Sequence, residues 1–132
     1  MFNNKQPEKL PEVIHSYSRA DAIRDGVLVD ASAIAREAGF KYGVALTRAV
    51  WEQCISIPSG VIGQDEAGRL WDVLHMLAAS IRRGADGSTV PFVVHVRNSN
   101  HGGMPPAVPL YAVCGPGDDG EPVITVMLPG ED

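Results

Sequence analysis

His15 and Tyr17 are the first residues in the chain whose types and spacing could do chemistry. On a β-strand, two residues at this spacing place their side chains on the same face. An imidazole and a phenol would then point toward a common ligand, with Arg19 two residues further on. The alternative is a surface strand with an aromatic ring packed on its edge, and the sequence favours that simpler interpretation.

Asp118, Asp119 and Glu121 form a second candidate group, because their carboxylates could hold a hard cation. Their spacing does not fit an EF-hand, whose ligands are spread over about twelve residues. Glycine and aspartate are also what a tight connection between strands requires. We therefore predict a turn without a metal, and we keep Asp118 and Asp119 as candidate contacts for a partner protein.

The segment NSNHGGMPP, residues 98–106, is a candidate contact loop. Exposed loops often carry binding residues, and Asn100, His101 and Met104 are the residues in it that could contact a partner. His95 and His101 could also suggest a metal, but no cluster of cysteine or aspartate supports them. No cofactor is expected.

The sequence lacks the recognised catalytic motifs. A nucleophilic Cys114 would need a nearby base or cation to lower its pKa, and the histidines after residue 70 are all distant from it in sequence. No Walker A loop, no GxGxxG after a strand, no GxSxG and no HExxH occurs. The sequence therefore leans away from an enzyme.

Composition indicates a single soluble domain. The chain has 132 residues, a net charge of −5, and no basic run, which argues against nucleic acid as a direct ligand. Residues 1–12 are polar and are predicted to be a flexible lead-in to one domain, 13–132. No apolar run is long enough to cross a membrane, and with no secretory leader the protein is predicted to be cytoplasmic, with both cysteines reduced.

Residues 64–83 are predicted to form the longest helix, on which the rest of the chain packs. Acidic residues begin this segment and arginines end it, which suits a helix dipole. Its apolar residues recur at spacings of three and four, and they are Ala67, Leu70, Trp71, Leu74, Leu77, Ala78 and Ile81.

Shorter elements are predicted around this helix. Residues 13–17 and 27–30 read as strands, and residues 19–25, 33–38 and 44–55 read as helices. Ser18 is suited to cap the helix that follows it. We expect Trp51 and Trp71 to pack against each other in a helical core.

After Gly84 the pattern changes to strands, at residues 89–96, 108–114 and 122–128. Three successive strands joined by turns predict an antiparallel meander. Alternation places one set of side chains against the long helix: Val94, Val96, Leu110, Ala112, Cys114, Ile124, Val126 and Leu128. The expected fold class is α+β, with helices packed on a small antiparallel sheet.

Four segments resemble a family of small bacterial proteins of unknown function. They are IHSYSRADAIRDGVLVD (14–30), AREAGFKYGVALTRAVW (35–51), GQDEAGRLWDVLHML (63–77) and the tail AVCGPGDDGEPVITVMLPGED (112–132). The resemblance implies carriage on plasmids, phages or integrative elements, and it implies no mechanism. It departs mainly at residues 56–62 and 98–106.

A second resemblance concerns His15 and Tyr17 alone. Their pattern, followed by a short helix and an apolar strand, is similar to the opening of ADP-ribosyltransferase and RNA phosphotransferase folds. Such folds would also need a late acid, and Glu121 matches by position. This resemblance implies a small nucleotide-handling enzyme that uses His15, Tyr17 and Glu121.

The leading hypothesis is therefore a non-enzymatic modulator from a mobile element that binds a host protein, for example as an anti-CRISPR or anti-restriction protein. The acidic charge would suit a basic groove on that partner. The enzyme described above is the alternative. Self-association through the exposed edge of the C-terminal sheet stays open as a third.

Overall fold

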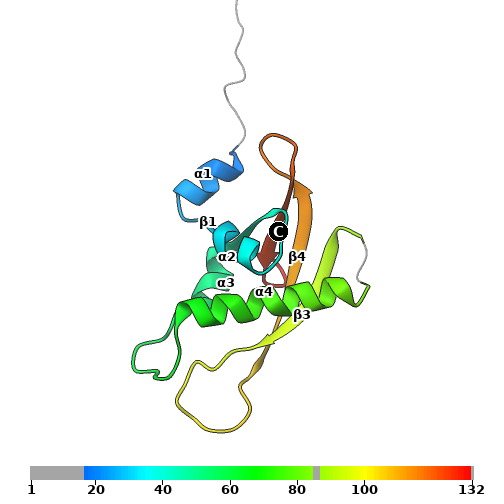
Figure 1. The fold of residues 1–132 in the computed structure, drawn as a ribbon. Helices are drawn as coiled ribbons and strands as arrows, with labels where there is room; N and C mark the ends of the chain where they lie inside the picture. Colours follow the sequence, from blue (N-terminus) through cyan, green and yellow to red (C-terminus); the bar gives the residue numbers. More distant parts are fainter. Residues whose placement is uncertain (1–16, 85–86, 132) are drawn as a thin grey trace, which may run out of the picture.

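The computed structural model describes residues 17–84 and 87–131, which form an α+β fold around a five-stranded mixed sheet (Figure 1). The helices are α1 (Arg19–Arg24), α2 (Ser32–Glu37), α3 (Arg48–Val50), the π-helix η2 (Trp51–Ile55) and α4 (Glu66–Arg82). The strands are β1 (Leu28–Asp30), β2 (Gly43–Thr47), β3 (Thr89–His95), β4 (Ala107–Pro116) and β5 (Pro122–Met127). The lead-in 1–12 and residues 13–16 of the first predicted strand lie outside the described residues.

The predicted meander is confirmed: β3 pairs antiparallel with β4, and β4 pairs antiparallel with β5. The strand order is β1-β2-β5-β4-β3, so the last strand lies in the middle of the sheet. β2 pairs with β5 in parallel, which makes the sheet mixed rather than wholly antiparallel. Sequence patterns do not show this pairing, because the two strands are far apart in the chain.

The predicted helix 44–55 is wrong in its first part, where the structure has strand β2. Val44, Ala45 and Leu46 are all buried, because β2 lies between two other strands and is covered on both faces. A strand covered on both faces is apolar throughout and shows no alternation, so it resembles a helix in sequence. Thr47 ends the strand and caps α3, since its side chain accepts a hydrogen bond from the Val50 amide.

The long helix is confirmed as α4, with Asp65 as its N-cap. Its buried face is rotated from the predicted one and carries Leu70, Val73, Leu74 and Leu77, together with Arg69 and Ser80. The predicted contact between tryptophans is wrong: Trp71 is partly exposed, and its ring lies against His75, with 4.5 Å between ring centroids.

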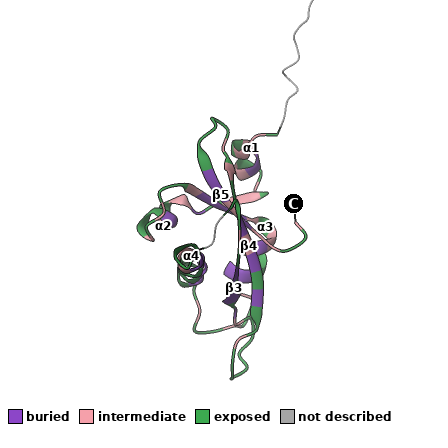
Figure 2. Ribbon diagram, turned by 90° about the vertical axis from the view of Figure 1, so that its right-hand side faces the viewer, coloured by how far each residue is buried: buried purple, intermediate pink, exposed green. Residues whose placement is uncertain are grey.

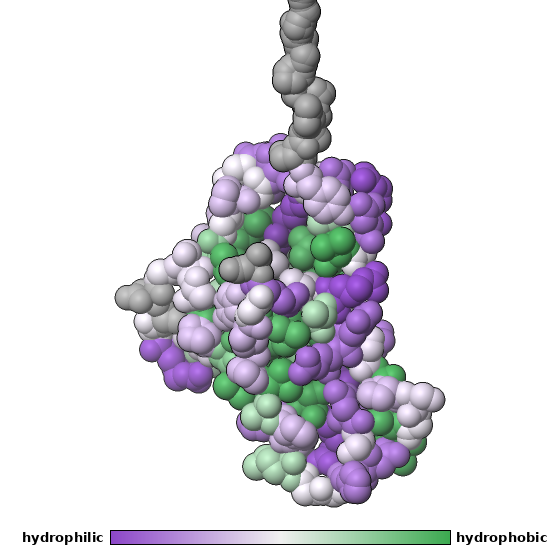
Figure 3. All heavy atoms as spheres, turned by 180° about the vertical axis from the view of Figure 1, so that it is seen from behind, coloured by the Kyte–Doolittle hydropathy of each residue, from purple (hydrophilic) through white to green (hydrophobic). Residues whose placement is uncertain are grey.

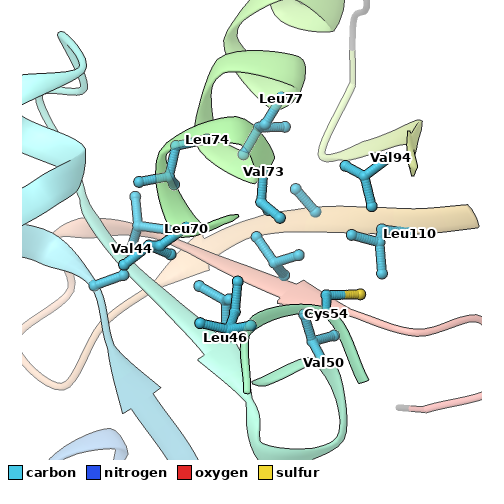
Figure 4. Close-up of a cluster of buried hydrophobic side chains, with 14 of the residues drawn as sticks. Val44, Leu46, Val50, Cys54, Leu70, Val73, Leu74, Leu77, Val94 and Leu110 are labelled. Atoms are coloured by element: carbon cyan, nitrogen blue, oxygen red, sulfur yellow. The ribbon is translucent and has the colours of Figure 1, made fainter. Parts of the chain in front are cut away.

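One core lies between α4 and the sheet. Figure 2 shows α4 and α2 on one side of the strands. Figure 4 shows the leucines and valines of α4 pointing toward Val44, Leu46 and Leu110, with Val50 and Cys54 in the same cluster. The predicted inward set of strand residues is buried except for Cys114, which is exposed, and Leu128, which is partly buried.

The opposite face of the sheet is covered only in part. α1 covers it near β5, because Arg19 reaches Thr125, whose side chain points away from the core residues Ile124 and Val126. Across β3 and β4 this face has a shallow apolar hollow that includes Pro91 and Val93. Figure 3, the view from behind, shows hydrophobic side chains along the middle of this face.

β3 is one of the two edge strands of the sheet, and Pro91 lies within it. The Val96 amide donates to the Pro106 carbonyl across the ladder. Because inward and outward amides alternate along an antiparallel strand, Pro91, five residues earlier, occupies an outward position. Proline has no N–H, so it removes an edge donor without removing a bond to β4. The edge is thereby less suited to pair with another strand.

The rotation of α4 gives a direct test by paired substitutions on one helix. Leu74→Ala should lower the free energy of unfolding by about 2–5 kcal/mol, because it leaves a cavity in a fully buried site. Ile81→Ala, at a residue 40% exposed, should lower it by less than about 1 kcal/mol. Urea denaturation monitored by circular dichroism measures both. Equal losses would contradict the observed face.

Candidate functional site

The predicted site residues fall into two regions. Asp118, Asp119 and Glu121 lie in the connection between β4 and β5, and Tyr17 precedes α1. Asn100, His101 and Met104 lie in the loop between β3 and β4. His15 lies outside the described residues, so its position relative to Tyr17 stays a prediction.

Ser18 is the N-cap of α1, as predicted, and Asp118 adds a second cap from a distant part of the chain. Its two carboxylate oxygens accept hydrogen bonds from the backbone amides of Arg19 and Ala20, at 2.8 and 3.0 Å. A carboxylate at this place satisfies amides that the helix leaves without partners and complements its dipole. Asp118, which was predicted to contact a partner protein, therefore stabilises the start of α1.

The side chain of Arg19 extends along β5. Its guanidinium donates to the Thr125 hydroxyl at 2.7 Å and to the Ile124 carbonyl at 2.8 Å. Burial lowers the pKa of Arg19, while the neighbouring carboxylates of Asp30, Asp118 and Glu121 raise it. Arg19 and these three acids line an open cavity of about 240 Å³, together with apolar residues such as Ile23 and Val123.

Glu121 is folded onto its own turn. One of its carboxylate oxygens accepts a hydrogen bond from the Asp119 amide at 3.0 Å. The same carboxylate lies where the Cβ of a larger residue at position 117 would be, so a substitution of Gly117 would displace the Glu121 side chain. The turn predicted at these acids is confirmed, since the backbone of Gly117 bonds to that of Glu121 across it.

Tyr17 is not part of a strand, and its hydroxyl donates to the Asp25 carboxylate at 2.7 Å. This hydrogen bond is the main reason why the pKa of Tyr17 is raised. No hydrogen bond joins Tyr17 to Glu121 in the part of the chain that the structure describes. Tyr17 and Glu121, the two described members of the predicted catalytic group, therefore bond to different residues, Asp25 and Asp119.

The second region is a pair of loops, residues 56–63 and 97–106, which we call the paired-loop tip. Both loops extend from the lower end of the molecule in Figure 1. Their connection centres on Arg69, which is only 6% exposed. Its guanidinium donates to the Ser56 carbonyl in one loop and to the Asn98 side chain in the other, each at 2.9 Å.

Arg69 also donates to the Arg97 carbonyl and to the Gln64 side chain. All four acceptors are neutral, and no carboxylate pairs with Arg69 among the described residues. Burial lowers the pKa of Arg69, with Cys54 opposing the shift. A buried cation with this many neutral acceptors fixes the geometry of the backbone that supplies them.

Two asparagines complete the connection between the loops. Asn98 donates to the Gln53 carbonyl at 2.9 Å. Asn100 donates to the Gly60 carbonyl at 2.8 Å and accepts from the Ile62 amide at 3.1 Å. The predicted contact residue Asn100 therefore holds one loop against the other.

The paired-loop tip presents two large apolar side chains to solvent, Ile62 and Met104, which are 77% and 83% exposed. His101 is exposed as well, and its carbonyl accepts from the Arg97 guanidinium. Sequence reasoning identified Met104 and His101 but missed Ile62 and Arg69. An isoleucine between two glycines in a loop, and an arginine next to the apolar face of a helix, were the available signals.

Within residues 17–84 and 87–131, no group of three or more His, Cys, Asp or Glu side chains could hold a metal ion. No helix of this part is long and apolar enough to span a membrane. Cys54 is buried and Cys114 is exposed.

The fold and its exposed residues define an α+β protein with a five-stranded mixed sheet and an apolar tip. The chain belongs to a family described as Family of unknown function (DUF6573), whose model matches residues 8–132. The resemblance to a family of unknown function is thereby confirmed over nearly the whole chain. No curated protein matches the chain, and no solved structure matches it.

Replacing Arg69 tests its role in the paired-loop tip. Arg69→Gln should lower the free energy of unfolding by about 2 kcal/mol or more, because several buried acceptors lose their donor. Amides in residues 56–63 and 97–106 should exchange hydrogen faster. Arg82→Gln is the matched control, since Arg82 is an exposed arginine on the same helix. Urea denaturation with hydrogen-exchange mass spectrometry measures both, and an Arg69 variant that matches this control would contradict the role.

The two cysteines should differ in reactivity. Burial raises the pKa of the Cys54 thiol to about 11, with Arg69 opposing the shift, so at pH 8 it is protonated and shielded. Ellman's reagent should therefore modify Cys114 quickly in the native protein and Cys54 only after denaturation. Cys114→Ser should abolish the fast reaction. A fast reaction that is lost instead in Cys54→Ser would show that Cys54 is accessible.

Proposed function

We propose that the protein is a non-enzymatic modulator, carried on a mobile element, that acts by binding a host protein. The host protein would be part of cellular machinery or of a defence system, as with anti-CRISPR or anti-restriction proteins. The paired-loop tip, with Ile62 and Met104 exposed on loops held by Arg69, is the observation that carries this proposal.

The tip supports binding through two properties. Exposed apolar side chains on a soluble protein are a feature of protein interaction sites. The loops that carry them are already fixed by Arg69, Asn98 and Asn100, so less conformational entropy is lost on association. The net charge of −5 adds attraction toward a basic partner.

The enzyme alternative, with His15, Tyr17 and Glu121, gains no support from the described residues. Tyr17 is bonded to Asp25, and Glu121 is folded onto the amide of Asp119. The alternative stays a prediction. Stabilisation of the protein by NAD or a nucleotide in a thermal-shift screen would favour it over protein binding.

Affinity capture from a lysate of the host strain tests the proposal. The tagged wild-type chain should retain a specific host protein through washes with moderate salt. The double variant Ile62→Ser, Met104→Ser should retain at least about tenfold less, because it removes the two apolar side chains that would anchor the contact. Quantitative mass spectrometry measures the retained protein.

Val27→Ser is the matched control, because Val27 is also an exposed apolar residue but lies between α1 and β1. It should retain the partner as the wild type does. Equal retention by the tip variant and the wild type, or no partner for either, would overturn the proposal.

A further inference from the structure

The outer flank of α4 has apolar residues that the core does not use. Ile81 is 40% exposed and Ala78 is partly exposed, although both belong to the apolar stripe predicted from the sequence. The sheet covers only part of the apolar stripe of α4. The helix directs Val73 toward the core, which leaves Ala78 and Ile81 at the edge of the covered surface. The remaining arc faces the segment that joins α2 to β2.

A groove lies between this flank and that segment, and we call it the α2–α4 groove. Its volume is about 360 Å³, which is within the usual range for small-molecule sites. Its apolar surface comes from Phe40, Tyr42, Ala78, Ile81 and Ile124. Tyr42 is 48% exposed, so an aromatic ring stands at the opening.

Two cations, Lys41 and Arg82, also line the groove, and no acidic residue does. In the part of the chain that the structure describes, neither cation takes part in a hydrogen bond or an ion pair. The arginines that do form ion pairs there, Arg24 and Arg48, lie elsewhere. In a protein of net charge −5, an apolar groove flanked by two cations without a described partner is complementary to an apolar anion.

We propose that the α2–α4 groove binds a small organic anion, a monocarboxylate with an aromatic or branched apolar body. The apolar body would lie against Phe40, Ile81 and Ile124, and the carboxylate would meet Lys41 and Arg82. Burial of the apolar body supplies affinity, and charge-assisted hydrogen bonds to the carboxylate select for the anion.

This inference goes beyond the proposed function, because the groove and the paired-loop tip lie at opposite ends of α4. Arg69 and Ile81 are twelve residues apart, which corresponds to about 18 Å along a helix. A ligand in the groove would therefore leave Ile62 and Met104 accessible.

Titration of the full-length protein with 2-naphthoate, followed by two-dimensional amide NMR, tests the proposal. Saturable shifts should appear in residues 38–42 and at the C-terminal end of α4. The neutral 2-naphthamide should bind at least about tenfold more weakly, since it lacks the charge that the two cations would pair with. Acetate alone should cause no saturable shift, because it has no apolar body.

Variants separate the two parts of the groove. Lys41→Gln with Arg82→Gln should weaken naphthoate about tenfold and leave the amide unchanged. Ala78→Phe should fill the groove and abolish both. Arg36→Gln, at an exposed cation outside the lining, and the double variant Ile62→Ser, Met104→Ser should both bind naphthoate as the wild type does.

Several results would overturn the proposal. Equal affinity for 2-naphthoate and 2-naphthamide would show that Lys41 and Arg82 do not select the anion. Chemical shift changes confined to residues outside the groove would show that the ligand binds elsewhere. Binding of an acidic apolar peptide without any binding of naphthoate would assign the groove to a protein. A doubled mass in analytical ultracentrifugation, lost in Ala78→Phe, would assign it to a second copy of the chain.

Discussion

The parallel pairing of β2 with β5 joins the two halves of the molecule. Gly43–Leu46 lie in register with Val123–Val126. One side of this pairing carries β1, α1 and α2, and the other carries the meander. α4 packs over both, because Leu70 and Leu74 belong to the same core cluster as Val44 and Val126. The placement of α4 sets the position of both the tip at its beginning and the groove near its end.

Arg69 shows how a charged side chain can organise loops that have little apolar contact of their own. Loops on a surface usually satisfy their backbone groups with water. Here the carbonyls of Ser56 and Arg97 accept from one buried guanidinium instead. A lysine could not make the same set of bonds, because its three donors leave from a single nitrogen. The arrangement thus depends on the shape of the guanidinium as well as on its charge.

The parts of the fold that depend on local interactions could be predicted from the sequence, and the parts that depend on contacts between distant residues could not. α4 and the three strands of the meander follow local periodicities, so the sequence predicts them. β2 was missed because burial on both faces removes alternation, and its pairing with β5 has no local signal. The buried face of α4 was mispredicted for a related reason. Val73 and Trp71 are both apolar, so the sequence does not show which of them faces the core. Only the packed sheet decides which of them is buried.

The candidate sites divide in the same way. Both loops, 56–63 and 98–106, were predictable from their glycines and prolines, whereas the connection between them was not, because Arg69 joins them through the fold. Asp118 and Asp119 were predicted as partner contacts from composition. The structure gives Asp118 to the amides of α1. Capping by a residue far away in the sequence cannot be predicted from the residues next to the helix.

That cap also has a consequence for the order in which the chain can become structured. Asp118 follows Arg19 by 99 positions, so the Arg19 and Ala20 amides of α1 lack this acceptor until Asp118 has been synthesised, and Ser18 alone caps the helix until then. β5 must also be synthesised before β2 can pair with both of its neighbouring strands, β1 and β5. Contacts of such high sequence separation slow folding. The structure around α1 and β2 therefore depends on residues 118–126, which are synthesised much later.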